Sequence, residues 1–411
     1  MKPSVSSPLD LGGTWRNRSA AETIGMLLRP EVLEAIGVTR VAHVDGLDRL
    51  GLPTVVAHRP RGTSLSSHQG KGIDHELATI SALMEALECD RAERFERVDR
   101  IASLNELLAE GRTAVVPEDL PGPRLFSCPP GVEEDLARDW IEFEDLGAAG
   151  GGGEHLVPAS LVRLDFDTDH HRHRLESRWL PPNTNGIAAG NSESEADLHA
   201  ICEVVERHAM AAPAAMISMD PDGTSDPLIS TLARHLDDAE IEVRLQLRLG
   251  RTCNDQHFVR IPTYLCLLID HGPKAIRRPS SFGSGSHPSP RVAILRAITE
   301  AVQARTSLVA GARDDILPEV YERSSQAHHD QPEPERIGSQ PIQPIGITPT
   351  NTGRLVEACI GRLADAGFDR VLARSLESAD EDAAAAVPVR RIVIPGMHFD
   401  PGVQRLRAAL Q

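Results

Sequence analysis

Three stretches of the chain repeat one spacing of polar residues: SALMEALE at 81–88, HAICEVVE at 199–206 and RAITEAVQ at 296–303. In each stretch the polar residues stand at positions i, i+4 and i+7, which lie on one face of an α-helix, and most residues between them are apolar. The pattern predicts three largely buried helices, each with a single polar stripe. The stripe residues are Ser81, Glu85 and Glu88; His199, Glu203 and Glu206; and Arg296, Glu300 and Gln303.

The stripes carry carboxylates one helical turn apart, and such pairs repel each other unless a cation lies between them. A single E-x-x-E pattern is typical of a solvated helix surface. Three stripes in the same phase, each in an apolar run, favour a shared site, because buried carboxylates must be paired or bound to a metal. Mg²⁺ prefers oxygen ligands and often shares them with substrate phosphates. The sequence therefore predicts a magnesium site where three carboxylate-striped helices surround a central cleft.

Composition and charge exclude several classes of protein. The 43 basic residues against 60 acidic ones give a net charge of −17, which argues against nucleic-acid binding. An apolar run of membrane-spanning length is absent from the sequence, as is the apolar core of a signal peptide near the N-terminus. The six cysteines are scattered and form no C-x-x-C pair. We therefore expect a protein of the reducing cytoplasm that does not act at a membrane.

The remaining patterns predict a mixed α/β (α+β) fold. Ser192 and Glu195 fit a capping box, and Ser289 with Pro290 fits the start of another helix. Helices are expected at 19–37, 74–95, from 193, 226–237, from 290, and 352–366. Strands are expected at 39–45, 53–59, 155–166, 241–249, 258–270, 368–374 and 387–397.

These elements suggest four parts of the chain. Residues 1–60 form an N-terminal helix and strands that lead into the core, and residues 61–320 form the core itself. Residues 321–350 are rich in Pro, Gln and His and read as a polar linker. Residues 351–411 form a C-terminal helix–strand segment that packs on the core.

Small-residue stretches before the striped helices are candidates for phosphate binding, because helix N-termini bind anions. We interpret Gly283–Gly285 and the segment around Asn185 as such loops, with ordinary loop flexibility as the alternative. Lys71, in a polar loop before the first striped helix, could neutralise phosphate charge. A Walker A motif is absent, so an ATP site here would be of another kind.

Other charged residues allow two interpretations. Arg207 and Arg305 follow two of the stripes and suit triphosphate binding, although a surface position is the simpler reading for either one alone. The cluster DTDHHRHR at 167–174 has no turn-defined metal-ligand spacing, and an exposed hairpin tip explains it as well.

Three long motifs resemble the YcaO superfamily of ATP-dependent enzymes that modify peptide backbones. They are GKGIDHELATISALMEALE at 70–88, NTNGIAAGNSESEADLHAICEVVER at 183–207 and GSGSHPSPRVAILRAITEAVQARTSLVAGARDD at 283–315. The resemblance covers about residues 40–320, and VPVRRIVIPGM at 387–397 resembles the closing strand of the family. The segment GLDRLGLPTVVAHRPRGTSLSSHQGKG at 46–72 is most similar to the branch associated with TfuA proteins.

The resemblance implies a YcaO-type ATP-binding fold without a P-loop, with residues 61–320 as its core and with ATP and Mg²⁺ as cofactors. It implies phosphorylation of a peptide-amide oxygen after a nucleophile has attacked the amide carbon. Glu85, Glu88, Glu203 and Glu206 would hold metal ions, and Glu203, Glu206 and Arg207 would be catalytic. The nucleotide would be lined by Lys71, Ser81, Asn185, His199, Arg207, Arg296, Glu300, Gln303 and Arg305.

The nucleophile decides the product that the resemblance implies. A neighbouring Cys, Ser or Thr side chain gives an azoline ring, whereas external sulfide gives a backbone thioamide. Many azoline-forming relatives end in P-x-P-x-P, but this chain ends PGVQRLRAALQ and shows no fused leader-binding domain. We therefore expect thioamide formation in a peptide or protein substrate, with a TfuA-like partner that delivers sulfur. The alternatives are an azoline-forming cyclodehydratase and a non-catalytic scaffold for a precursor peptide. Assembly as a homodimer is left open.

Overall fold

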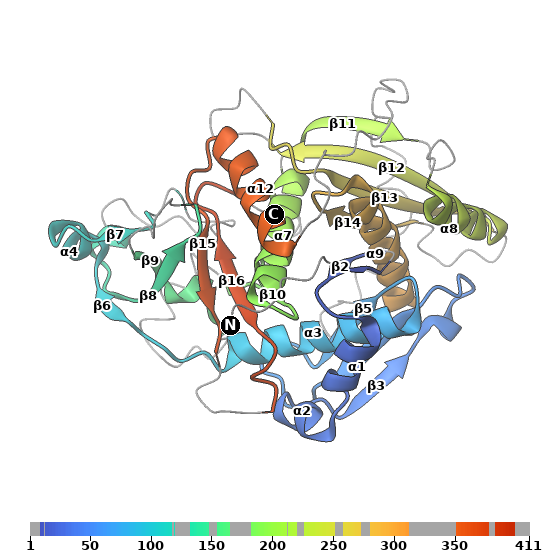
Figure 1. The fold of residues 1–411 in the computed structure, drawn as a ribbon, viewed down its shortest axis with the longest axis horizontal. Coiled ribbons are helices and arrows are strands. Elements are labelled where there is room, and N and C mark those ends of the chain that lie inside the picture. Colours follow the sequence, from blue (N-terminus) through green and yellow to red (C-terminus); the bar gives the residue numbers. More distant parts are fainter. Residues whose placement is uncertain are drawn as a thin grey trace, which may run out of the picture. The chain divides into compact units, whose positions relative to one another are not determined.

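The computed structural model describes twelve segments of the chain and shows a mixed fold of helices and strands, as predicted (Figure 1). The described residues are 9–11, 13–116, 119, 132–147, 154–164, 182–211, 213–219, 226–250, 258–272, 280–311, 351–377 and 383–398. The predicted linker at 321–350, the histidine cluster at 167–174 and the last residues of the chain lie outside them. Within the described residues, no helix is long and apolar enough to cross a membrane.

The chain divides into two compact units, and the division falls within two of its helices. The first unit comprises Met1–Leu87, Pro213–Leu249 and Ile261–Leu355, and the second comprises Glu88–Ala212, Gly250–Arg260 and Val356–Gln411. Each unit is therefore assembled from segments that are distant in the sequence. The predicted division into residues 1–60, 61–320, 321–350 and 351–411 stays a prediction.

The first unit contains three sheets. The three-stranded antiparallel sheet has the order β3-β4-β5, with Val56 opposite Gln69. The four-stranded sheet has the order β11-β12-β13-β14, and β1 pairs with β2. The strands are β1 (Leu9–Asp10), β2 (Trp15–Arg16), β3 (Arg40–His43), β4 (Thr54–His58), β5 (Ser67–Lys71), β11 (Pro213–Met219), β12 (Ile241–Gly250), β13 (Thr263–Asp270) and β14 (Ser280–Ser286).

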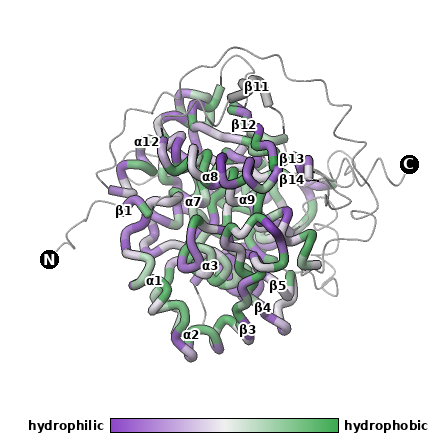
Figure 2. The backbone as a smooth tube through the Cα atoms, turned by 90° about the vertical axis from the view of Figure 1, so that its right-hand side faces the viewer, coloured by the Kyte–Doolittle hydropathy of each residue, from purple (hydrophilic) through white to green (hydrophobic). Residues whose placement is uncertain are grey.

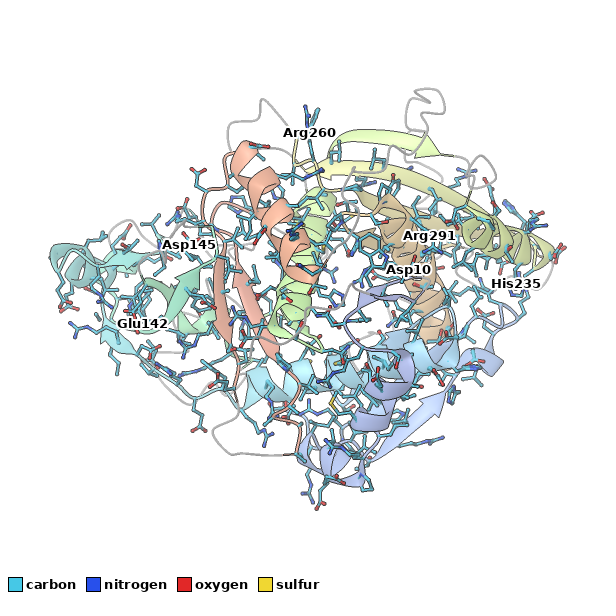
Figure 3. All side chains as sticks on the ribbon, viewed as in Figure 1. Asp10, Glu142, Asp145, His235, Arg260 and Arg291 are labelled. Atoms are coloured by element: carbon cyan, nitrogen blue, oxygen red, sulfur yellow. The ribbon has the colours of Figure 1, made fainter. Side chains whose placement is uncertain are left out.

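The core of the first unit forms where α9 (Pro290–Ala310) packs against β13 and β14. Ile294 and Val302 of α9 meet Leu236 of α8 (Pro227–Asp238) and Tyr264 of β13 in one buried cluster. Hydrophobic and hydrophilic residues alternate along the backbone (Figure 2). Arg291, in the first turn of α9, binds Asp10 at 3.1 Å (Figure 3). The other helices are α1 (Ala20–Leu27), α2 (Pro30–Ala35), the 3₁₀ turn η1 (Asp45–Leu47), α3 (His75–Glu93) and α8 (Pro227–Asp238).

The second unit is built on a seven-stranded sheet. Its order is β10-β16-β15-β8-β9-β7, and β6 also pairs with β8. Trp140 of β8 is buried and donates from Nε1 to the carbonyl of Ala102 at 2.9 Å, and α7 packs on β10 and β16. The elements are β6 (Arg100–Ala102), α4 (Leu104–Ala109), β7 (Thr113–Ala114), α5 (Val132–Asp135), β8 (Arg138–Asp145), β9 (His155–Pro158), η3 (Ala159–Leu161), β10 (Ile187–Ala189), α7 (Glu193–Ala211), α12 (Thr352–Asp365), β15 (Leu372–Ser375) and β16 (Val389–Val393).

Two sequence predictions of local structure were wrong. The single helix expected at 19–37 is two helices, because Pro30 holds Arg29 in an extended conformation with φ −61° and ψ 133°. The polar loop expected around Lys71 and the loop expected at Gly283–Gly285 lie in strands, β5 and β14. Their Ser and Gly residues are small because the strands lie against helices, not because the backbone must bend.

Next to each striped helix, a glycine lets another segment of the chain pack directly against the helix backbone. A Cβ at Gly70 would lie 1.9 Å from the carbonyl oxygen of Ala78 in α3, and one at Gly283 would lie 2.1 Å from the amide nitrogen of Ala301 in α9. A Cβ at Gly190, directly after β10, would lie 2.5 Å from the amide nitrogen of Ala196 in α7. All three helices therefore pack against a glycine of a neighbouring segment, and only glycine fits at these positions.

Candidate active site

Eight of the nine stripe residues are half-buried positions of largely buried helices. In α3, every residue from Leu77 to Ala92 is buried except Ser81, Glu85 and Glu88, which are half-buried. In α7, His199 and Glu203 are half-buried and Glu206 is buried. In α9, Arg296 and Glu300 are half-buried between buried neighbours, and Gln303 is half-buried. Polar groups at these positions keep limited contact with solvent. That the three stripes line one cleft stays a prediction.

In the first unit, Lys71 at the end of β5 forms an ion pair with Glu300 of α9. Glu300 also accepts hydrogen bonds from the amide and the hydroxyl of Ser284 on β14, at 3.3 and 3.4 Å. Two predicted nucleotide residues from distant parts of the sequence are thereby brought together. The ammonium of Lys71 is suited to binding an anion, and the carboxylate of Glu300 is suited to binding the cation that accompanies it.

Arg296 lies one turn before Glu300, and its Nε is buried without a hydrogen-bond partner among the described residues. Burial, and then the charge of Arg296, lowers the pKa of His287 to about 3, so this imidazole is neutral at physiological pH. His287 accepts a hydrogen bond from the amide of Ser289 at 3.0 Å. A buried donor of Arg296 is therefore available to a ligand oxygen beside a neutral histidine.

Arg305 occupies a different environment from the other predicted nucleotide residues. It is 3% exposed, and its guanidinium binds Asp48 at 2.7 Å and Asp270 at 2.9 Å. Arg49 pairs with the same Asp270. Because both carboxylates already occupy Arg305, its geometry favours a structural role that ties η1 and β13 to α9. Contact between Arg305 and a nucleotide stays a prediction.

In the second unit, the pKa of the predicted metal ligand Glu203 is raised. Burial raises the pKa of Glu203, and the neighbouring Glu206 raises it further, although 24% of the Glu203 side chain is exposed. Arg207, 3.8 Å away, and Arg391 act in the opposite direction. Two acidic side chains in a poorly solvated place favour a bound cation.

Arg391 is a residue that sequence reasoning missed as part of the site. It is 1% exposed on β16, and its guanidinium donates to the carbonyl and the side-chain oxygen of Asn183 at 2.9 and 3.2 Å. Burial lowers the pKa of Arg391 to about 10, against the opposing attraction of Glu203. An arginine inside the apolar run VPVRRIVIPGM was the available signal, because charged residues are rarely fully buried without a partner.

The other predicted residues of the second unit have distinct surroundings. Glu88 accepts a hydrogen bond from the amide of Ala189 at 2.7 Å, which joins α3 to β10. Asn185 has a buried Oδ1 without a hydrogen-bond partner among the described residues. Glu85, assigned to the first unit, lies 3.9 Å from the Nδ1 of buried His68.

The donor set fits Mg²⁺ and a phosphate ligand. The carboxylates of Glu203 and Glu206 and the orphaned Oδ1 of Asn185 are oxygen donors, which Mg²⁺ prefers. The Nε of Arg296 and the ammonium of Lys71 suit phosphate oxygens. Of these groups, the Oδ1 of Asn185 and the Nε of Arg296 are buried without a hydrogen-bond partner among the described residues, so each would gain one from a bound ligand.

Comparisons with known proteins agree with this chemistry. A model of the family described as YcaO cyclodehydratase, ATP- and Mg²⁺-binding, matches residues 69–398. An uncharacterized protein in the tfuA 3′ region of Rhizobium leguminosarum bv. trifolii is 31% identical over 404 residues, covering 93% of this chain and 89% of the relative.

Two solved structures share the fold. YcaO from Methanopyrus kandleri, bound with AMPPCP and Mg²⁺, is 24% identical with a TM-score of 0.68, and the match covers 95% of this chain and 94% of that one. A heterocyclase in complex with substrate and cofactor is 21% identical with a TM-score of 0.73. That match covers 95% of this chain and 54% of the heterocyclase, so this chain spans about half of its length. The chain therefore belongs to the YcaO family of ATP- and Mg²⁺-binding, peptide-modifying enzymes.

Proposed function

We propose that this protein activates a peptide-backbone amide by ATP- and Mg²⁺-dependent phosphorylation of the amide oxygen, for thioamide formation with a TfuA-like partner. The observation that carries the proposal is the poorly solvated carboxylate pair of Glu203 and Glu206, with Arg391 buried beside it in a chain of the YcaO family. Two carboxylates of like charge in a poorly solvated place favour a bound cation.

We assign roles by the chemistry of each side chain. Glu203 and Glu206, with Glu85 and Glu88, would hold Mg²⁺, which neutralises phosphate charge as it develops. Lys71 and Arg296 would contact phosphate oxygens, and Ser81, Asn185, His199, Glu300 and Gln303 would complete the nucleotide surroundings. Arg207, exposed and one turn from Glu203, would approach the reacting phosphoryl group from solvent.

The proposed reaction solves a defined chemical problem, since an amide is a poor electrophile and its oxygen a poor leaving group. Hydrosulfide adds to the amide carbon, and the resulting oxyanion takes the γ-phosphoryl group of ATP. Phosphate then leaves with the former amide oxygen as the C=S bond forms. The products are thioamide, ADP and hydrogen phosphate, so the proton of hydrosulfide ends on the phosphate.

The sulfur step is supported by one relative and opposed by another. The similar protein of Rhizobium leguminosarum bv. trifolii takes its description from the neighbouring tfuA region, which favours a TfuA-like partner for this chain. The heterocyclase of known structure favours the alternative, in which a side-chain nucleophile of the substrate closes an azoline ring. Both reactions use the same activated amide, so the distinction lies in the nucleophile.

Mass spectrometry of a candidate substrate peptide incubated with the protein, MgATP and sulfide separates these outcomes. Exchange of oxygen for sulfur adds about 16 Da, whereas cyclodehydration removes about 18 Da. We expect the gain, and we expect an added TfuA-like protein to lower the sulfide concentration that is needed, because a bound donor raises the effective concentration of the nucleophile. Loss of water would establish the cyclodehydratase. ATP binding without phosphate release in the presence of a peptide substrate would leave only the scaffold.

A further inference from the structure

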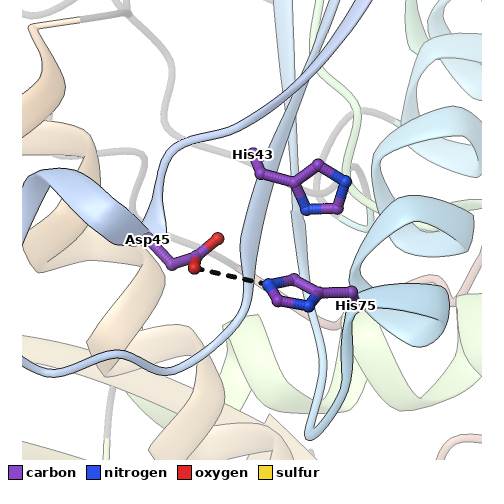
Figure 4. Close-up of side chains that lie close together, drawn as sticks. All are labelled: His43, Asp45 and His75. Carbon is purple, nitrogen blue, oxygen red and sulfur yellow. Dashed lines mark hydrogen bonds and ion pairs between the residues drawn. The ribbon is translucent and has the colours of Figure 1, made fainter.

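A second cluster of metal-ligating side chains lies in the first unit, apart from the carboxylate stripes. His43 ends β3, Asp45 begins η1, and His75 is the first residue of α3. One ligand atom from each of the three lies within 4.8 Å of those of the other two. Figure 4 shows the three side chains pointing toward one another. Folding thus gathers two imidazoles and one carboxylate from three elements at one point.

We propose that His43, Asp45 and His75 form a binding site for a transition-metal ion of the Zn²⁺ class. Zn²⁺ is commonly held by three protein ligands of the His and Asp or Glu type, with water in the fourth position. Imidazole nitrogen also selects Zn²⁺, Ni²⁺ or Co²⁺ over Mg²⁺, which prefers oxygen donors. This site is therefore chemically distinct from the proposed magnesium site.

The distances fit this ligand set with a small adjustment. Ligand atoms bound tetrahedrally at zinc distances lie roughly 3.3 Å apart. The Nε2 of His75 and the Oδ2 of Asp45 are already 3.3 Å apart. The ring of His43 stands edge-on to that of His75, with centroids 4.7 Å apart. His43 is exposed, so rotation of its side chain can bring a nitrogen inward without displacing core residues.

Asp45 supplies a second, independent observation. While its Oδ2 faces His75, its Oδ1 is buried and has no hydrogen-bond partner among the described residues. An ordinary exposed His–carboxylate pair does not leave a carboxylate oxygen buried and unsatisfied. A bound cation would remove that deficit.

An ion at this site would join β3 and η1 to the first turn of α3, the helix that carries Ser81 and Glu85. The same short segment continues to Asp48, which binds Arg305 of α9. Metal binding would therefore fix the segment from His43 to Asp48 at both ends. This inference concerns binding alone and does not depend on the proposed amide chemistry.

Zinc stoichiometry provides the first test. Purified full-length protein is stripped with chelator, dialysed against Zn²⁺ with excess Mg²⁺, and its bound zinc is counted by atomic emission. The double variant His43→Gln/His75→Gln should bind one equivalent less than wild type. The matched control is His271→Gln, which removes an exposed histidine that contacts Glu242 at 2.8 Å with no second imidazole. That variant should keep the wild-type count. Because the chain has 17 histidines, only the difference between variants is informative.

Location of the ion provides a second test that needs no variant. Crystals of the wild-type protein grown with Zn²⁺ should give an anomalous difference peak at the zinc absorption edge among His43, Asp45 and His75. Equal zinc counts in all three proteins, displacement of the ion by Mg²⁺, or anomalous peaks only at other histidines would each overturn the proposal. An unchanged melting curve of the double variant is expected without zinc, because both substituted side chains are exposed.

Discussion

Arg391 of β16 and Glu203 of α7 hold opposite charges close enough for each to shift the pKa of the other. Burial moves both residues toward their neutral forms, and each is partly held in its charged form by its neighbour. The guanidinium of Arg391 makes its hydrogen bonds to Asn183 and acts on Glu203 through its charge, which leaves the Glu203 carboxylate suited to a magnesium ion.

Removing the Arg391 charge should change the pH dependence of ATP hydrolysis. Arg391→Met raises the pKa of Glu203 further, so the carboxylate that binds Mg²⁺ forms only at higher pH. The acid limb of the pH–rate profile should therefore move upward. Arg391→Lys keeps the charge and should leave the limb near that of wild type. An unmoved limb in folded Arg391→Met protein would show that Arg391 does not position the charge of Glu203.

Glu203→Gln should abolish ATP turnover and leave the fold intact. We expect phosphate release to fall by more than about 100-fold, since changes around a metal ligand alone cost about 10–100-fold. Glu193→Gln, an exposed position in the first turn of α7, serves as the control and should keep its activity. Wild-type rates of phosphate release from Glu203→Gln would remove the metal role from this residue.

The same variant should show a stability difference that depends on pH. The folded pKa of Glu203 is raised above its unfolded value of about 4.3, so the folded state binds the proton more tightly than the unfolded chain. The contribution of this carboxyl group to stability is therefore greatest below the unfolded pKa and is lost as pH rises through the folded pKa. In metal-free buffer at neutral pH, Glu203→Gln should melt at or above the wild-type temperature, and the gap should close in acid. A lower melting temperature at neutral pH would contradict the raised pKa.

Arg305→Ala should destabilise the fold and not act through ATP affinity. Asp48 would be left buried without its guanidinium partner and Asp270 would keep only Arg49, at a cost of about 3–5 kcal/mol in the free energy of unfolding. Arg244→Ala breaks an exposed pair with Glu242 and should cost less than about 1 kcal/mol. Denaturant titrations measure both. A near-wild-type stability with a raised KM for ATP would instead assign Arg305 to the nucleotide.

Gly283→Ala should disrupt the contact between β14 and α9. The added Cβ would lie 2.1 Å from the backbone nitrogen of Ala301, and relief of that overlap requires strand or helix to move, at about 1–3 kcal/mol or more. Gly361→Ala in α12 meets no atom within 4 Å and should stabilise by about 0.5–1 kcal/mol. Thermal melts of the two variants should therefore shift in opposite directions. Equal shifts would mean that the glycine contact is not tight in solution.

The striped helices were predictable because their signal is long and local. The expected helix at 74–95 is α3, His75–Glu93, and Pro290 stands at the start of α9 behind Ser289, as expected. The helical spacing of polar and apolar residues extends over eight or more positions, so the prediction does not depend on any single residue. The amide of Glu195 bonds to Ser192 Oγ at 3.2 Å, as a capping box requires, although the Glu195 carboxylate also accepts from Asn191.

Short buried strands were not predictable in the same way. Residues 67–71, SHQGK, contain no β-branched or aromatic residue, yet they form the buried strand β5 because β4 and α3 enclose them. Strand β8, RDWIEFED, is rich in charged residues, yet it lies inside the seven-stranded sheet. Its neighbouring strands β6, β9 and β15 come from other parts of the chain. Arg391 was not predictable for the same reason: its role follows from its hydrogen bonds to Asn183 and from the charge of Glu203, and neither leaves a local sequence pattern.

The glycine contacts also set the tolerance of this chain to insertions. Gly70 meets the backbone of α3 at Ala78 and Ala82, on either side of Ser81, so the rotation of that helix is fixed where its polar stripe begins. One extra residue between Ala78 and Ser81 would turn the stripe by roughly 100° into the packed interior. Insertions and deletions should therefore be tolerated only outside the segment that runs from β5 to the polar stripe of α3. A single substitution at a stripe position leaves the packing of the helix unchanged. The chemistry of such a site can therefore change through substitution of stripe residues, but not through insertion or deletion within the helix.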